Sequence, residues 1–325
     1  MTLSKNAAHY KGSVPDTAPR SLIVPSDCAG LRLDQVLSKL LPEYSRSRLQ
    51  QWIRDGLVSV DGDTAESKRK IWGGENIDVL PQATAAELAF APEDIPLAIV
   101  HEDESLLVID KPAGLVVHPG SGNWSGTLLN ALLRHLPALA ELPRAGIVHR
   151  LDKETSGLLV VAKSLTAHTD LVRQLQARTV GREYDAFVHG FIERPGRVDA
   201  PVGRHPKERT RMAVIAAGKP SVTHFEPVEH GARWTWLRCH LETGRTHQIR
   251  VHLTSIDHPL IGDPVYRGKR APKALPESVR TFRRQALHAA RLSLLHPHSG
   301  AKMQWNAPMP ADMLALLDAL RSENP

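Results

Sequence analysis

A carboxylate in a polar loop is the group in this 325-residue chain whose setting best suits chemistry. Asp152 ends the run Ala145-Gly-Ile-Val-His-Arg-Leu-Asp152, and the apolar part of that run is typical of a β-strand. A polar turn follows, and a second apolar run begins at Leu158. Flanking strands fix the ends of a loop while its side chains stay accessible. We therefore expect the activity to centre on Asp152.

Two further segments carry basic residues beside groups that could line a site. The first is Arg182-Glu-Tyr184, at the start of a predicted strand. The second runs from Gly244 to Arg250 (Gly-Arg-Thr-His-Gln-Ile-Arg), where a glycine turn joins a predicted strand to a helix. Taken alone, Tyr184 would be interpreted as an ordinary aromatic residue that packs in a strand.

Together, the three segments resemble the RluA-type family of RNA pseudouridine synthases. The resemblance covers nearly the whole chain, and the motifs that carry it are His149–Asp152, Thr155–Gly157 and Gly244–Arg250. Glu154 stands where the family more often has aspartate. The resemblance implies that the protein isomerises specific uridines of large-subunit (23S) ribosomal RNA to pseudouridine.

The implied reaction breaks the N1–C1′ bond, turns the uracil and joins C5 to C1′, and it needs no cofactor or metal. The resemblance assigns the catalytic carboxylate to Asp152, which either attacks C1′ or removes a proton from C2′; the sequence leaves both open. Burial would raise the pKa of this carboxyl group, and a nearby cation would offset that effect. The resemblance assigns this cation to Arg250, so we predict a salt bridge between the two at the pocket floor. The resemblance also implies that Tyr184 stacks on uracil and that Arg150 fills the gap left by the flipped uridine.

Other side chains near these motifs are expected to be structural. His118 and His149 are interpreted as histidines that hydrogen-bond within loops, and Lys111 as a residue that either contacts phosphate or braces a loop. The 17 histidines of the chain show no ligand spacing such as His-Glu-x-x-His, so no metal site is predicted. A glycosidase-like mechanism would need a second carboxylate in the pocket, and Glu154 is the nearest in sequence.

The N-terminal part of the chain has the pattern of a small module over residues 21–80. Apolar residues recur at helical spacing from Leu31 to Leu41, and Ser45 can cap a second helix. Asp61-Gly62 favours a hairpin turn, and a last strand is predicted over 76–80. Two helices followed by a small sheet, with basic residues on the second helix, resemble the S4 RNA-binding domain.

The charge of the chain suits a polyanionic partner. The net charge is +6, and residues 200–300 hold 17 Lys and Arg against 7 Asp and Glu. We expect binding to structured ribosomal RNA, either free or in a precursor of the large subunit. The rival interpretation is a non-catalytic RNA-binding factor of ribosome assembly. The residues predicted to contact RNA, besides Arg150, are Arg46, Arg48, Lys68, Arg69, Lys70, Arg245 and His247.

The predicted fold class is α+β. We expect a catalytic domain whose mixed, largely antiparallel sheet is flanked by helices, because strands outnumber helices without regular alternation. No apolar run is long enough to span a membrane, and no obligate protein partner is expected; the prediction is a cytoplasmic monomer. The predicted domains are a disordered tail (1–20), an S4 domain (21–80), a linker (81–95) and a catalytic domain (96–325).

Secondary structure in the second domain is predicted from periodicity and from turn residues. The predicted helices cover 127–135, 166–178 and 310–321. The predicted strands cover 97–100, 106–109, 183–191, 212–216, 222–228 and 234–242.

Overall fold

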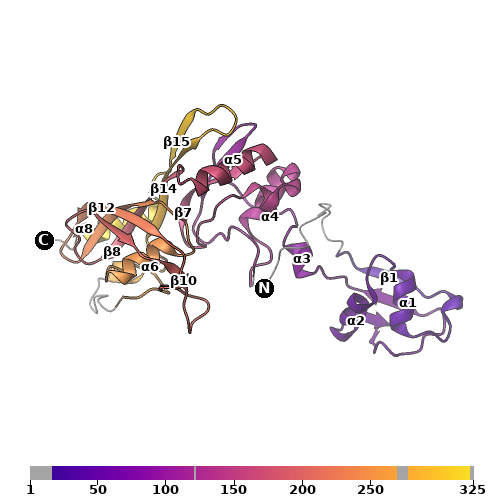
Figure 1. Cartoon of the computed structure of the whole chain (residues 1–325). Helices are drawn as coiled ribbons and strands as arrows, with labels where there is room; N and C mark the ends of the chain where they lie inside the picture. The colour runs from indigo at the N-terminus through magenta and orange to yellow at the C-terminus, as the bar shows by residue number, and fades with distance from the viewer. Residues whose placement is uncertain (1–16, 121, 269–276, 323–325) are drawn as a thin grey trace. The chain divides into compact units, whose positions relative to one another are not determined.

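The chain forms two compact units, a small one that ends at Ala91 and a large one that begins at Pro92. Most of the predicted disordered tail lies outside the described residues, but its last residue, Arg20, begins strand β1 (Arg20–Ile23). The structure is a computed structural model and describes residues 17–120, 122–268 and 277–322 (Figure 1).

The small unit is a four-stranded antiparallel sheet with two helices. Its strands lie in the order β1-β4-β2-β3. The apolar residues with helical spacing are buried, as Leu33, Val36 and Leu37 show, and the hydroxyl group of Ser45 accepts the Arg48 N–H as the predicted cap. Strand β1 was not predicted, because its partner β4 lies more than fifty residues along the chain. The remaining elements are α1 (Leu33–Leu40), α2 (Arg46–Arg54), β2 (Val58–Val60), β3 (Asp63–Thr64) and β4 (Asn76–Val79).

Part of the segment predicted to be a linker packs on the small unit. It includes the short helix α3 (Ala85–Leu88). Arg48 of α2 donates to both carboxylate oxygens of Glu87 at 2.8 Å and to the carbonyl oxygen of Gln82 at 2.8 Å. Ala91 is buried as well. The chain is therefore held by the small unit up to its boundary.

A mixed sheet of nine described strands is the centre of the large unit. Neighbouring strands follow the order β5-β6-β7-β14-β8-β13-β12-β9, and β15 pairs with β14. Only β7 and β14 are parallel, which confirms the largely antiparallel sheet. The strands are β5 (Ile99–Glu102), β6 (Leu106–Lys111), β7 (Ser156–Ala162), β8 (Gly181–His189), β9 (Gly196–Asp199), β12 (Val222–His230), β13 (Trp234–Leu241), β14 (Leu287–Leu295) and β15 (Lys302–Asn306).

Helices and a small hairpin complete the large unit. Helix α5 packs near β7, and α6 packs near β11 and β12 (Figure 1). None of the helices in the described residues is long and apolar enough to cross a membrane. These elements are α4 (Leu128–His135), α5 (Leu165–Gln176), β10 (Val202–Arg204), β11 (Met212–Val214), α6 (Gln248–Ser255), α7 (Glu277–Arg280) and α8 (Ala311–Ser322).

The apolar run before Asp152 is not a strand, so this prediction is wrong. Residues Pro143–Gly146 form a short 3₁₀ segment in which Ala145 has φ 51° and Gly146 has φ 78°. A side chain at Gly146 would start 2.0 Å from the carbonyl oxygen of Ala162, so only glycine allows this close approach. The run is apolar because it is buried against β7, and the Asp152 loop is bounded by a regular strand on one side only.

Candidate active site

Asp152 and Arg250 form the predicted ion pair. Nη1 of Arg250 lies 3.0 Å from Oδ2 of Asp152. The Arg250 side chain is 5% exposed and that of Asp152 is 16% exposed, so the guanidinium group is buried while the carboxylate still reaches solvent. The first turn of α6 thus supplies a buried cation to a carboxylate that lies nearly 100 residues earlier in the chain.

A second carboxylate, Asp263, holds the other side of Arg250. Nε and Nη2 of Arg250 donate to the two oxygens of Asp263 at 2.7 and 2.9 Å. Asp263 also accepts the backbone N–H groups of Val265 and Tyr266, and the Tyr266 ring lies 4.9 Å from the guanidinium carbon. Burial would lower the pKa of Arg250, but the bonds and charges of Asp263 and Asp152 raise it above its ordinary value. Arg250 is therefore a fixed cation shared by two acids.

The loop before α6 is held by Gln248, whose side chain is almost completely buried. Its carbonyl oxygen accepts from the Thr243 hydroxyl at 2.7 Å and from the Arg245 N–H at 3.0 Å. Its amide donates to Thr223 and to the carbonyl oxygen of Val222. Sequence reasoning missed Gln248 and Asp263 because periodicity does not show that Gln248 reaches Val222 or that Asp263 reaches Arg250.

Lys111 braces the loop that carries Asp152. This lysine has no exposed surface, and its ammonium group donates to the carbonyl oxygens of Pro112, Leu115 and Lys153 at 2.7, 2.9 and 3.0 Å. Burial lowers the pKa of Lys111 to about 8. Of the two roles predicted for Lys111, the structure supports bracing.

Tyr184 and His247 flank the ion pair. Tyr184 lies on β8, is 6% exposed, and has its pKa raised by burial and by the nearby charge of Asp152. Nε2 of His247 is 3.8 Å from Oδ1 of Asp152, and its Nδ1 is hydrogen-bonded to the Tyr266 hydroxyl at 2.8 Å. Because His247 has φ 56°, its backbone is in the left-handed region that is uncommon for side chains other than glycine. Such strain is typical of functional sites.

His149 has the structural role that the sequence predicts. Its Nε2 lies 3.1 Å from the Val160 N of β7, and that N–H can only donate, so Nε2 must carry no proton. Burial, together with the positive charge of Arg182, lowers the pKa of His149 to about 3. The Nδ1 of His118 lies 3.2 Å from the carbonyl oxygen of Pro119, and burial lowers the pKa of His118 too.

Arg150 and Arg245 are exposed near this cluster. Neither side chain forms a hydrogen bond or an ion pair within the described parts of the chain. The charge of Arg150 lowers the pKa of His247, although burial has the larger effect on that histidine. Both arginines are thus positioned for an external anion.

The basic residues of the small unit differ in how far they are already engaged. Arg46 donates to Asp34 at 2.7 Å but keeps half of its side chain exposed. Arg48 is held by Glu87 and Gln82, and its guanidinium carbon lies about 5 Å from the ring centres of Tyr44 and Trp52. Arg48 is therefore engaged within the small unit, and its contact with RNA stays a prediction. Lys68, Arg69 and Lys70 are exposed.

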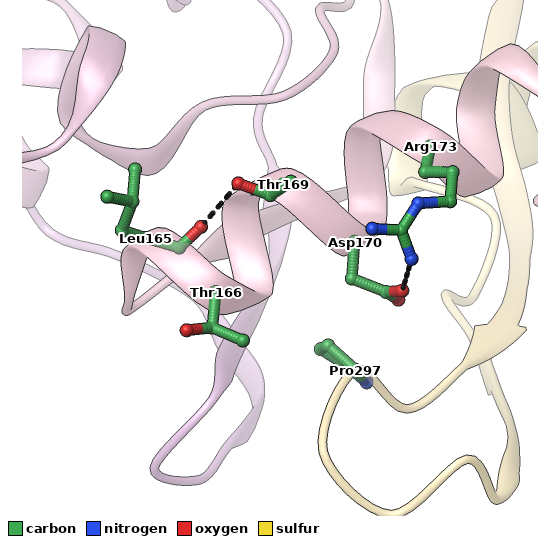
Figure 2. Close-up of a pocket in the computed structure, with 6 residues that line it drawn as sticks. All are labelled: Leu165, Thr166, Thr169, Asp170, Arg173 and Pro297. Atoms are coloured by element: carbon green, nitrogen blue, oxygen red, sulfur yellow. Dashed lines mark hydrogen bonds and ion pairs between the residues drawn. The ribbon is translucent and has the colours of Figure 1, made fainter.

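A surface hollow elsewhere on the large unit lacks comparable chemistry in the described residues that line it. One open hollow of about 520 Å³ runs along α5, and Figure 2 shows Arg173 reaching to Asp170 beside it. Asp170 also accepts from Gln174, so its carboxylate is already engaged. The hollow is lined by Leu165, Thr166, Thr169, Asp170, Arg173 and Pro297.

In the parts of the chain that the structure describes, no second accessible carboxylate is bonded into the cluster. Asp263 is the acid linked to Asp152 through Arg250, and its side chain is only 1% exposed and fully hydrogen-bonded. Glu154 contributes its backbone carbonyl to Arg284, and no bond between its side chain and the cluster is found in the described residues. Among the described residues, the cluster therefore holds one accessible carboxylate, whereas glycosidase chemistry needs a pair.

The sequence profile of the RNA pseudouridylate synthase family matches residues 105–255, and that of the S4 domain matches residues 31–77. Ribosomal large subunit pseudouridine synthase D of Nitrosomonas europaea is 57% identical over 96% of this chain and 90% of its own length. The protein of the same name from Escherichia coli K12 is 52% identical over 90% of this chain and 92% of its own length.

Solved structures agree with these matches. Human RNA pseudouridylate synthase domain containing 4 is 25% identical, with a TM-score of 0.55 over 69% of this chain and 93% of that one. Human RNA pseudouridylate synthase domain containing 1 has a TM-score of 0.52 over 74% of this chain and 98% of that one. These comparisons support an enzyme over a non-catalytic binding factor. With a buried Arg250 set against the accessible Asp152, and with relatives more than half identical over nearly its full length, the chain belongs to the RNA pseudouridine synthase family.

Proposed function

We propose that the chain converts specific uridines of large-subunit (23S) ribosomal RNA to pseudouridine, with Asp152 as the catalytic carboxylate. The observation that carries the proposal is the ion pair in which a buried Arg250 faces a carboxylate that is 16% exposed. The names of the relatives that match nearly the whole chain support the choice of RNA. The reaction takes place in the cytoplasm and is carried out by a monomer.

In this proposal, Asp152 acts on the sugar of a uridine that has left its stack. Asp152 either attacks C1′ or removes the proton from C2′. Arg250 balances the charge of the carboxylate, and Asp263 keeps the guanidinium group from turning away. Tyr184 stacks on the uracil ring, and Arg150 takes the place of the flipped uridine in the RNA.

The RNA is held mainly through its phosphates, so binding weakens as salt rises. On the large unit, Arg245 and His247 contact RNA beside the site. On the small unit, the contacts are Arg46, Lys68, Arg69 and Lys70, whose exposed side chains support this role. Arg48 is a further proposed contact, and its guanidinium group is also bonded to Gln82 and Glu87.

The test is the substitution Asp152→Asn, assayed on large-subunit ribosomal RNA that lacks pseudouridine. The variant keeps the shape of the side chain but removes its charge and its nucleophile. We expect pseudouridine formation, measured by chemical mapping of the RNA, to fall by at least about 10²-fold, the lower bound for losing acid–base catalysis. RNA affinity should remain that of the native protein.

Asp318→Asn is the matched control, because Asp318 is 78% exposed on α8 of the same unit. It should leave both the rate and the affinity unchanged. Native-like turnover by Asp152→Asn would rule out Asp152 as the catalytic group. Absence of pseudouridine formation by the native protein on this RNA would refute the proposed substrate.

A further inference from the structure

Arg182 is a buried arginine that the proposed function does not use. Arg182 is only 8% exposed, and its Nε is completely buried without a hydrogen-bond partner. Within the described residues, no ion pair or hydrogen bond to the Arg182 side chain is found. Only Nε is both buried and unpartnered, so Nη1 and Nη2 keep some contact with solvent.

A buried cation without a counter-ion is unfavourable, because desolvation of the charge is not compensated. The acids nearest in sequence are engaged elsewhere. Glu183 and Asp185 face the other side of β8, where Glu183 pairs with Arg238 and Arg291 and Asp185 pairs with Arg238. The protein thus provides a guanidinium group and leaves its anion to come from outside.

The position of Arg182 ties that missing anion to the RNA site. Residues 182 and 184 point to the same face of β8, so Arg182 lies one step along the strand from Tyr184. Its charge reaches His149, at the start of the motif that ends in Asp152. Across the sheet, Arg182 pairs in register with Leu292 of β14.

Gly244 leaves room for the guanidinium group at the surface. A Cβ atom at Gly244 would lie 2.6 Å from Nη1 of Arg182, so any side chain there would push the group away. Gly244, Arg245 and Thr246 are all exposed, and the Arg245 side chain has no bond in the described residues. An anion that approaches this loop meets Nη1, a second arginine and a hydroxyl group.

We propose that Arg182, together with the exposed loop Gly244–Thr246, binds a backbone phosphate of the RNA strand that presents the flipped uridine. This inference rests on the proposed function. A phosphodiester fits because it carries a full negative charge and pairs well with a guanidinium fork, whereas uracil is neutral when it enters the site. Phosphate contacts also fix the register of a bound nucleic-acid strand.

Two variants test the site. Arg182→Met removes the charge and keeps an unbranched apolar stem, and Gly244→Ala keeps the charge but displaces the guanidinium group. The matched control is Arg233→Met, an exposed arginine at the opposite end of β13 from Gly244. The measurements are the thermal unfolding midpoint, the affinity for protein-free large-subunit ribosomal RNA at several salt concentrations, and the single-turnover rate at saturating RNA.

We expect Arg182→Met to unfold at the same temperature as the native protein or higher, because it removes an uncompensated buried charge. It should bind RNA at least about tenfold more weakly, as expected for a lost charge-assisted contact. The slope of log affinity against log salt concentration should be shallower by about 0.7 to 0.9 than that of the native protein. The single-turnover rate at saturating RNA should be unchanged. Gly244→Ala should weaken binding in the same direction, and Arg233→Met should match the native protein.

A lower unfolding midpoint for Arg182→Met would mean that Arg182 also supports the fold, and Gly244→Ala then decides by its RNA affinity. Unchanged RNA affinity of Arg182→Met would overturn the proposal. If the affinity is unchanged and the single-turnover rate is slower, the positive charge of Arg182 would instead stabilise the departing uracil. If Arg182→Met does not fold, Gly244→Ala decides by the same affinity criterion. These outcomes concern RNA binding, so they remain distinguishable from a native protein that binds RNA but forms no pseudouridine.

Discussion

Each unit of the molecule contains a cluster of aspartate and arginine, and the two clusters have opposite composition. In the small unit, one carboxylate, Asp34, is shared by two arginines: Arg32 at 3.1 Å and Arg46 at 2.7 Å. In the large unit, one guanidinium group, Arg250, is shared by two carboxylates, Asp152 and Asp263. The first cluster has an excess of positive charge and the second an excess of negative charge.

The carboxylates of the two clusters also differ in how far they are exposed to solvent. Asp34 has no exposed side-chain surface and also accepts from the Gln50 amide at 2.6 Å, so its oxygens are fully engaged. Asp152 is 16% exposed and accepts a single short bond from Arg250. Buried, saturated carboxylates hold structure together, whereas a carboxylate with a free side can meet a substrate. The accessible partners therefore differ: they are the arginines in the small unit and the Asp152 carboxylate in the large unit.

The largest effect should come from Arg250→Met, which leaves two carboxylates without their shared cation. Removing one member of a buried ion pair destabilises a protein by about 3–5 kcal/mol, because the remaining charge is uncompensated. We expect a loss of this size in the free energy of unfolding, measured with urea, and no detectable pseudouridine formation. A fully stable but inactive variant would mean that Arg250 serves chemistry alone.

A smaller effect is expected from Asp34→Asn in the other cluster. Arg32 and Arg46 remain 37% and 50% exposed, so water can solvate their charges when the carboxylate is lost. We expect a local loss of about 2 kcal/mol, the value of a hydrogen bond to a charged group. Amide hydrogen exchange should quicken in α1 and α2 but not in β8, and single-turnover chemistry at saturating RNA should be unchanged. Slower chemistry would contradict the division of roles.

The smallest effect is a pH dependence of the Asp34 cluster. Burial alone would raise the pKa of Asp34, but hydrogen bonds from Arg46 and Gln50 lower it below its ordinary value of 3.8. A depressed pKa stabilises the folded state above that value, and this contribution is lost as the pH falls through the folded pKa. The difference in exchange protection between native protein and Asp34→Asn should therefore shrink below about pH 4. A constant difference would show that the charge of Asp34 is not what stabilises the unit.

The sequence carried enough information for the ion pair but not for its support. Asp152 and Arg250 stand in two motifs whose resemblance to a family assigns them together. Asp263 and Gln248 act through long-range contacts with Arg250 and with β12, which periodicity cannot reveal. Helix periodicity places Arg48 on a surface, but it cannot show that Glu87, 39 residues later, pairs with its guanidinium group.

The fold shows the same limit. The helices over 127–135, 166–178 and 310–321 were predicted within about two residues, because each carries a local apolar period. Strand β14 was missed, although it joins β7 to β8 at the middle of the sheet. Its first four residues are all buried, so the alternation that indicates a half-exposed strand is confined to its second half. The run before Asp152 failed for the opposite reason, since its apolar residues suit a strand but its φ angles do not.

The cage of carbonyl oxygens around Lys111 has a consequence for complex formation. Its ammonium protons join residues 112 and 115 to the backbone of Lys153, so the segment that presents Asp152 is already rigid before any ligand arrives. Preorganisation of this kind reduces the ordering that binding would otherwise demand of the protein. The conformational adjustment then falls on the nucleotide, and a uridine in an already loosened RNA loop should react more readily than one in a stable helix.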